Sequence, residues 1–190
     1  LFRSVDSKAA RGYALLDAAQ AHVQRAHKAA PVRLRGKMTL EQAFLAIGAN
    51  CLAQLESNVP GVLERDVESL HQMRVGLRRL RALVAMFEKL VQAPAAVREG
   101  LDWLSGELGA ARDWDVLAGS TLERIAGLDP ASLRQAAETK AEAYHRQLAQ
   151  TLRAPHFTQV LLQVGGWLHG RAWRAGDGLP LIIAQRIALF

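Results

Sequence analysis

The chain has 190 residues, of which 50% are hydrophobic and 22% are charged. This balance excludes a disordered chain, and the length suits one domain with a sizeable core. Lysine and arginine number 24 against 18 aspartates and glutamates, which gives a formal net charge of +6 at pH 7. A polyanionic partner is therefore expected, provided that the cations cluster on one surface.

Cys51 is the only cysteine, so neither a disulfide framework nor a thiolate metal cage is expected. It falls on the apolar side of a predicted helix and is interpreted as a small core residue. No stretch approaches the roughly 18 consecutive apolar residues of a membrane span. No secretory signal is apparent either. We therefore expect a cytoplasmic protein that does not enter a membrane.

The first clear helix is predicted over residues 39–57. It opens with TLEQ, in which Thr39 and Gln42 form a capping box, and it stops at SNVPG. A second helix is predicted over residues 65–91. A third is predicted over residues 96–108, closed by Gly109.

The later elements follow the same helical period. A short segment is predicted over residues 112–125, then a turn at LDP and a long amphipathic helix over residues 131–153. Another helix begins at Pro155 and runs to residue 167. A loop with GDGLP and an apolar tail, LIIAQRIALF, come last. Strand-like alternation is nearly absent, so the fold class is all-α, an antiparallel helical bundle with short connections.

The helix over residues 65–91 carries cations beside its apolar face. On a helical wheel one sector holds the predicted core residues Leu70, Met73, Leu77, Leu80, Val84 and Phe87. The adjacent sector holds what we call the basic stripe: His71, Arg74, Arg78, Arg81 and Lys89. Arg79 lies on another side. No acidic residue occurs between Ser69 and Phe87, so no anion lies among the arginines of the stripe.

Two interpretations of the basic stripe remain open. Most charge runs are solvated faces, but such faces usually interleave charges of both signs. Arginines three and four residues apart repel one another unless a partner neutralises them, and guanidinium groups suit phosphate oxygens. His71 as a general base or metal ligand would need a nucleophile or further ligands, and neither is visible in the sequence.

A second concentration of charge is LGAARDWDVL, which holds Arg112, Asp113 and Asp115. The two carboxylates either bind a divalent metal over a phosphate or lie at a helix start and orient an arginine of a neighbouring helix. The structural reading is favoured, with Arg112 extending the basic surface. Nucleotide-binding, serine-hydrolase and zinc-protease motifs are missing. No metal and no cofactor are expected.

The motif HQMRVGLRRLR together with LGAARDWDVL resembles the CHAD family, the conserved histidine α-helical domain. The resemblance implies two similar four-helix halves around a basic channel. It also implies binding of long-chain inorganic polyphosphate without catalysis, in the bacterial cytoplasm and at polyphosphate granules. The binding residues it implies are His71, Arg74, Arg78 and Arg81, with Arg79 and Arg112.

SKAARGYALL resembles the end of a CYTH domain, which often precedes CHAD. Residues 1–36 are therefore interpreted as a linker and the tail of a CYTH-like domain. Residues 37–190 are interpreted as a CHAD-like domain whose C-terminal half is incomplete. The resemblance implies a second basic helix that does not occur here, so we expect either a fragment or a homo-oligomer that completes the fold.

Three functional hypotheses follow. The leading one is non-catalytic binding of inorganic polyphosphate. The second is an accessory or regulatory domain of a metal-dependent triphosphatase or other phosphohydrolase, with Asp113 and Asp115 holding metal. The third is nucleic-acid binding, which is disfavoured because no aromatic residue interleaves with the cations of the stripe from His71 to Arg81.

Overall fold

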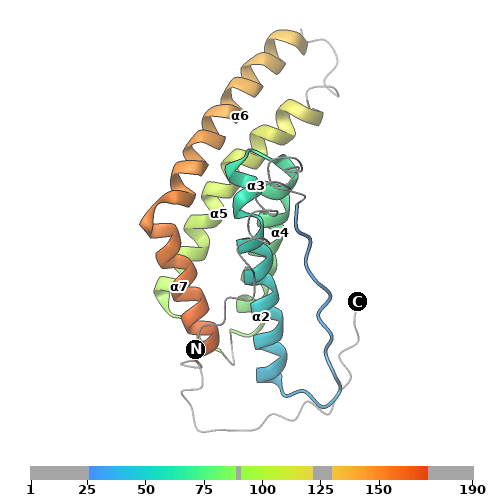
Figure 1. Ribbon diagram of the computed structural model, residues 1–190, viewed down its shortest axis with the longest axis vertical. Coiled ribbons are helices and arrows are strands. Elements are labelled where there is room, and N and C mark those ends of the chain that lie inside the picture. The colour runs from blue at the N-terminus through green and yellow to red at the C-terminus, as the bar shows by residue number, and fades with distance from the viewer. Residues whose placement is uncertain (1–25, 89–90, 122–129, 171–190) are drawn as a thin grey trace, which may run out of the picture.

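The computed structural model describes residues 26–88, 91–121 and 130–170, and these residues form helices and connecting segments without a strand. The elements in chain order are α2 (Leu40–Ser57), α3 (Val59–Leu63), α4 (Val67–Met86), α5 (Ala95–Val116), the π-helix η1 (Leu117–Thr121), α6 (Pro130–Arg153) and α7 (Pro155–Gly170). The predicted all-α bundle is confirmed (Figure 1). None of the helices described here is long and apolar enough to cross a membrane.

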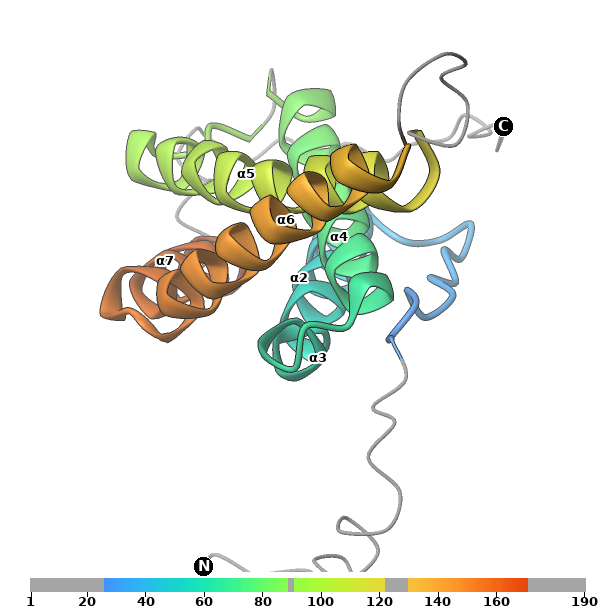
Figure 2. The ribbon, with the colours of Figure 1, turned by 90° about the horizontal axis from the view of Figure 1, so that it is seen from above.

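Helix α5 lies along one edge of the bundle when seen from above (Figure 2). It contacts α4, α6 and α7, while α2 packs against α4 and α7. The largest fully buried side chains come from all five long helices and include Phe44, Leu70, Met73, Leu104, Leu148 and Leu168. One apolar core therefore fixes the orientation of α4 and α5, and with it the direction of their polar faces.

The predicted core face of α4 is confirmed. Its members Leu70, Met73, Leu77, Leu80 and Phe87 are buried, and Val84 is partly buried against them. Helix α4 begins after Asp66, whose carboxylate accepts hydrogen bonds from the backbone N–H groups of Glu68 and Ser69. This cap places the start of the helix two residues later than the sequence pattern predicted.

Two further predictions hold for α2. The capping box is present, because the Thr39 hydroxyl accepts from the Gln42 N–H at 3.2 Å and the Gln42 side chain accepts from the Thr39 N–H at 3.0 Å. Cys51 is fully buried in the core. Burial raises the pKa of its thiol, and the nearby Arg79 charge opposes that rise. Helix α2 ends at Ser57 as predicted, and the segment that follows it forms the short helix α3.

The predicted break between the helix over residues 96–108 and the segment from residue 112 was wrong. Gly109 does not close a helix, and α5 runs through it without a break to Val116. A Cβ atom at Gly109 would lie 3.3 Å from Nη1 of Arg74, so this glycine lets the arginine side chain of α4 approach the α5 backbone. Asp113 and Asp115 consequently lie in the last turn of α5, directly before η1, and not at a helix start, so the predicted stabilisation by a helix N-terminus does not apply.

Before α2 the described residues form no helix. Residues 26–38, which we call the strap, run beside the α2 and α4 pair and turn at Gly36 and Lys37. The side chains of Asn50 and Asn58 hold the strap to α2 through its backbone. The proposed CYTH-like motif at residues 7–16, the GDGLP loop and the apolar tail lie outside the described residues.

Candidate anion-binding site

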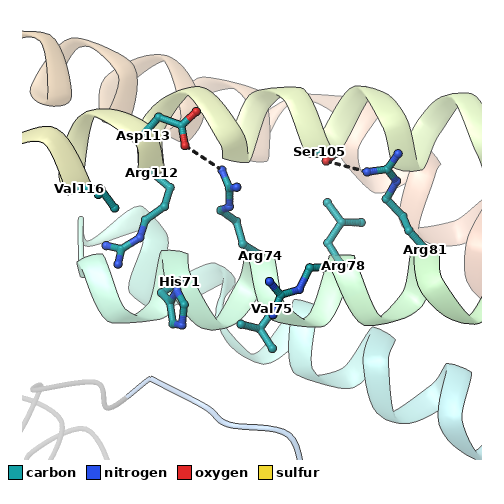
Figure 3. Close-up of a pocket in the computed structure, with 10 residues that line it drawn as sticks. His71, Arg74, Val75, Arg78, Arg81, Ser105, Arg112, Asp113 and Val116 are labelled. Carbon is teal, nitrogen blue, oxygen red and sulfur yellow. Dashed lines mark hydrogen bonds and ion pairs between the residues drawn. The ribbon is translucent and has the colours of Figure 1, made fainter. Parts of the chain in front are cut away.

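A cavity of about 430 Å³ opens between α4 and α5. Helix α4 contributes His71, Arg74, Val75, Leu77, Arg78 and Arg81, and α5 contributes Ser105, Arg112, Asp113 and Val116 (Figure 3). Four guanidinium groups thus line one cavity with a single carboxylate. Its electrostatic potential is expected to be positive and to attract anions.

The structure brings together most of the predicted basic stripe. Residues three and four apart on a helix share one face, and burial of the α4 core turns that face toward the seam with α5. Arg112 reaches the same cavity from α5, which extends the stripe as predicted. Lys89 lies outside the described residues, and Arg79 is not among the lining residues.

Arg74 lies against the backbone of α5. Its Nη1 is 3.4 Å from the Leu108 carbonyl oxygen and 3.7 Å from Oδ1 of Asp113. The side chain of Arg74 is 37% exposed and that of Asp113 is 79% exposed. Asp113 therefore faces an arginine of the neighbouring helix, as the structural interpretation expected, in a long and solvated pair.

Arg81 has two partners on α5. Its Nη2 lies 2.7 Å from Oδ1 of Asp102, and its Nη1 donates to Oγ of Ser105 at 3.2 Å. Helix α5 thus supplies a carboxylate, Asp102, to a row of arginines that has no acidic residue within it. Exposed pairs of this kind contribute only about 0–1 kcal/mol each, so water or a competing anion replaces them at low cost.

Three further side chains of the cavity are unpaired within the described part of the chain. The side chains of His71, Arg78 and Arg112 have no hydrogen bond or ion pair with any described residue. A guanidinium group has five N–H donors, and water satisfies them when no protein group does. The cavity therefore presents unsatisfied donors to whatever enters it.

Arg79 lies in a different environment. Its Nη1 donates to Oε1 of Gln54 at 2.8 Å, and its Nη2 donates to Oδ1 of Asn50 at 2.9 Å. Gln54 in turn donates to Oε1 of Gln72 at 3.1 Å, and Gln72 donates to Glu68 at 2.7 Å. Arg79 is therefore part of a polar network that joins α4 to α2.

The two carboxylates of the RDWD motif point to different places. Asp115 is buried, with a side chain only 5% exposed, and its Oδ1 lies 2.8 Å from Nε2 of His145 on α6. Asp113 faces Arg74 instead. The structure does not bring the two aspartates to one site. The described residues contain no group of three or more His, Cys, Asp or Glu side chains suited to hold a metal ion.

Sequence reasoning missed part of the α5 wall. Asp102, Ser105 and Gly109 precede Arg112 at intervals of three and four residues, which is one face of a helix. This pattern was available in the sequence. It went unrecognised because a helix predicted to end at Gly109 divides that face between two elements.

Comparisons with known proteins identify the family to which this helical fold belongs. The model of the CHAD domain family matches residues 46–188. The crystal structure of the CHAD domain from the plant Ricinus communis is similar, with 40% sequence identity and a TM-score of 0.73. The similarity covers 78% of this chain and 51% of that chain, so the present chain spans about half the length of the plant domain. No curated protein matches.

Proposed function

We propose, from the premise that this chain belongs to the CHAD domain family, that it binds long-chain inorganic polyphosphate in the cavity between α4 and α5. The observation that carries the proposal is the convergence of Arg74, Arg78, Arg81 and Arg112 on one open cavity. The proposal is one of binding without turnover. It places the protein in the cytoplasm, at polyphosphate granules.

The spacing of the arginines supports a chain-like ligand. From His71 to Arg81 the cations span about 15 Å of helix, since each residue adds about 1.5 Å. A repeating anion satisfies several donors in turn, and each guanidinium group can form two hydrogen bonds with one phosphate. His71 donates at the start of the row. Among the lining residues described, none is a Phe, Tyr or Trp on which a base would stack, so a chain of phosphates fits better than a nucleic acid.

The alternative of a metal-dependent phosphohydrolase site has little support from the geometry. It required Asp113 and Asp115 to hold a metal together, but these residues pair with Arg74 and His145 on opposite neighbours of α5. The groups in the cavity are donors that hold phosphate, and the exposed carboxylate is engaged with a guanidinium group. A direct check is phosphate release from triphosphate with magnesium or manganese, which we expect to be absent.

The main test is a titration with long-chain polyphosphate at several salt concentrations. The cavity offers five contacts, from His71, Arg74, Arg78, Arg81 and Arg112. At roughly 0.7 per contact, as for single-stranded nucleic acids, a plot of the logarithm of the binding constant against the logarithm of the salt concentration should have a slope of about −3.5. Arg74→Ala/Arg78→Ala should lower both the affinity and the slope. The matched control is Arg146→Ala/Arg153→Ala, which removes the same charge from exposed positions of α6.

The outcomes separate cleanly. Loss of binding in the cavity variant but not in the α6 control, with weak competition by DNA, supports a polyphosphate site. Equal loss in both variants, or full displacement by DNA at the same phosphate concentration, would mean that the protein attracts polyanions only through its net charge.

A further inference from the structure

The strap carries a second row of cations. Residues 26–38 contain no acidic residue, and their charged side chains are Lys28, Arg33, Arg35 and Lys37. All four are exposed, and none forms an ion pair with a described residue. Successive side chains of an extended chain point to opposite sides. Arg33 and Arg35 therefore share a side, while the intervening Leu34 and the half-buried Val32 face the other way.

The strap is fastened to the bundle through its backbone. Asn58, which is 1% exposed, donates from Nδ2 to the His27 carbonyl at 2.8 Å, and its Oδ1 accepts from the His27 N–H at 2.9 Å. Asn50 donates to the Ala30 carbonyl at 2.9 Å. The side-chain amides of Asn50 in α2 and of Asn58 at its C-cap thus bond to the backbone of the strap, which has no partner strand among the described residues.

The same asparagine joins the strap to α4. Oδ1 of Asn50 accepts from Arg79, which follows Arg78 of the cavity in sequence. Figures 1 and 2 both show the strap beside the α2 and α4 pair, with α5 on the other side of α4. The exposed face of α4 therefore lies between two basic borders, the cavity and the strap.

We infer that the strap is a second basic wall of the anion site, with Arg33, Arg35 and Lys37 contacting a polyphosphate chain that crosses the exposed face of α4. This inference rests on the proposed function and enlarges its site. The strap precedes residues 46–188, so the family match does not include it.

The anchoring explains how such a segment contributes to affinity. Ordering a flexible residue costs conformational entropy, so a loose basic tail would lose much of its electrostatic gain on binding. Asn50 and Asn58 order the strap before the ligand arrives. A short anion that fills only the cavity does not reach the strap, which makes ligand length a diagnostic variable.

The experiment compares two variants of the full chain. Arg33→Gln/Arg35→Gln/Lys37→Gln removes three cations from exposed positions and is not expected to affect folding. Lys140→Gln/Arg146→Gln/Arg153→Gln removes three exposed cations from α6 and serves as the matched control. Each is titrated with long-chain polyphosphate and with triphosphate across a salt series, beside Arg74→Ala/Arg78→Ala.

With the three strap contacts added to the five of the cavity, at roughly 0.7 each, the wild-type log–log salt slope for long-chain polyphosphate should be about −5.6. The strap variant should flatten it to about −3.5, the value for the cavity alone, and leave triphosphate binding unchanged. The α6 control should match the wild type with both ligands. If the strap variant behaves as the control while the cavity variant loses binding, the strap inference is wrong and the proposed function stands. If the cavity variant also binds as the wild type, the proposed function itself fails.

An anchor variant tests the same idea without changing charge. Asn50→Ala removes the bond to Ala30 and should weaken long-chain binding while the net charge stays the same. Because Asn50 also contacts Arg79, thermal unfolding is measured alongside. Unchanged long-chain affinity in a folded Asn50→Ala protein would show that the anchoring is irrelevant to binding.

Discussion

The two flanks of α4 use neighbouring arginines in opposite ways. Arg78 points into the open cavity and has no partner among the described residues, whereas Arg79 is bonded to Gln54 and Asn50 of α2. Both side chains have the same charge and the same five donors. A candidate binding residue is therefore distinguished by guanidinium N–H groups that have no acceptor among the described residues. One flank of α4 is closed by α2, and the other remains open beside α5.

Helix α5 repeats this contrast with carboxylates. Asp113 is solvated and faces Arg74 across the cavity, while Asp115 is buried against His145. The residues are two apart and so lie on nearly opposite sides of the helix. The contact between α4 and α5 thus contains an open cavity, whereas the contact between α5 and α6 contains a buried pair of side chains. Variants on the two sides should separate binding from stability.

The largest expected effect is on the closed side. His145→Ala leaves the Asp115 carboxyl buried without its partner, and breaking a buried pair in this way costs about 3–5 kcal/mol. Urea unfolding measures the change. Asp115→Ala/His145→Ala removes both members and should recover part of the loss. His169→Ala, at an exposed position of α7, is the control. A loss under about 1 kcal/mol in His145→Ala would mean that the pair does not hold α5 to α6.

The second prediction compares the effects of Arg79→Ala and Arg78→Ala on stability and on binding. Arg79→Ala leaves Gln54 and Asn50 without their donor and should lower the free energy of unfolding by about 1–3 kcal/mol. Arg78→Ala should change it by less than about 0.5 kcal/mol. Polyphosphate titration should give the reverse order, with Arg78→Ala the weaker binder. If both variants lose binding equally, the division of α4 into an open and a closed flank is wrong.

The third prediction concerns the helix start that both flanks share. The hydrogen bond from the Ser69 hydroxyl, with those from the Glu68 and Ser69 amides, lowers the pKa of Asp66, and partial burial opposes this. A lowered folded-state pKa means that the stabilisation is present above the unfolded value of about 4 and is lost as the pH falls below it. Asp66→Ala should cost about 1 kcal/mol at pH 7.

The paired control for this prediction is Asp66→Asn. Asparagine is a good cap, so this variant should keep most of the stability at pH 7. It should also lose the part of the acid sensitivity that comes from Asp66. Urea unfolding of the three proteins between pH 3 and 7 tests this. Parallel pH profiles for wild type and Asp66→Asn would contradict the prediction.

The apolar period was sufficient to predict α6 and α7 and to place the cations of α4 on one stripe, although α4 ends at Met86 and not near residue 91 as predicted. Burial of Leu70, Met73 and Leu80 leaves no other direction for Arg74 and Arg78. Local sequence therefore predicts both the face and the residues of the cavity that α4 supplies.

The α5 wall required tertiary information. The local sequence around Gly109 predicts a helix end, because glycine is common just after the last turn of a helix. In the structure this glycine instead leaves space for the side chain of Arg74 beside the α5 backbone. Likewise, the RDWD motif alone does not distinguish Asp113 from Asp115, since their partners Arg74 and His145 are far away in sequence. The strap was missed for the same reason: its anchors, Asn50 and Asn58, lie on the helix that follows it.

The smallest expected effect lies on the open side. Asp113→Asn removes an exposed carboxylate whose contact with Arg74 is 3.7 Å long, so stability should change by at most about 1 kcal/mol. Polyphosphate binding should strengthen, because the substitution removes the only carboxylate among the described residues that line the cavity and keeps a side chain of similar shape. Glu138→Gln, at an exposed position of α6, controls for net charge and should bind as the wild type. Weaker binding in Asp113→Asn would instead mean that the carboxylate holds Arg74 in its binding position, and that this orientation outweighs the repulsion between Asp113 and phosphate.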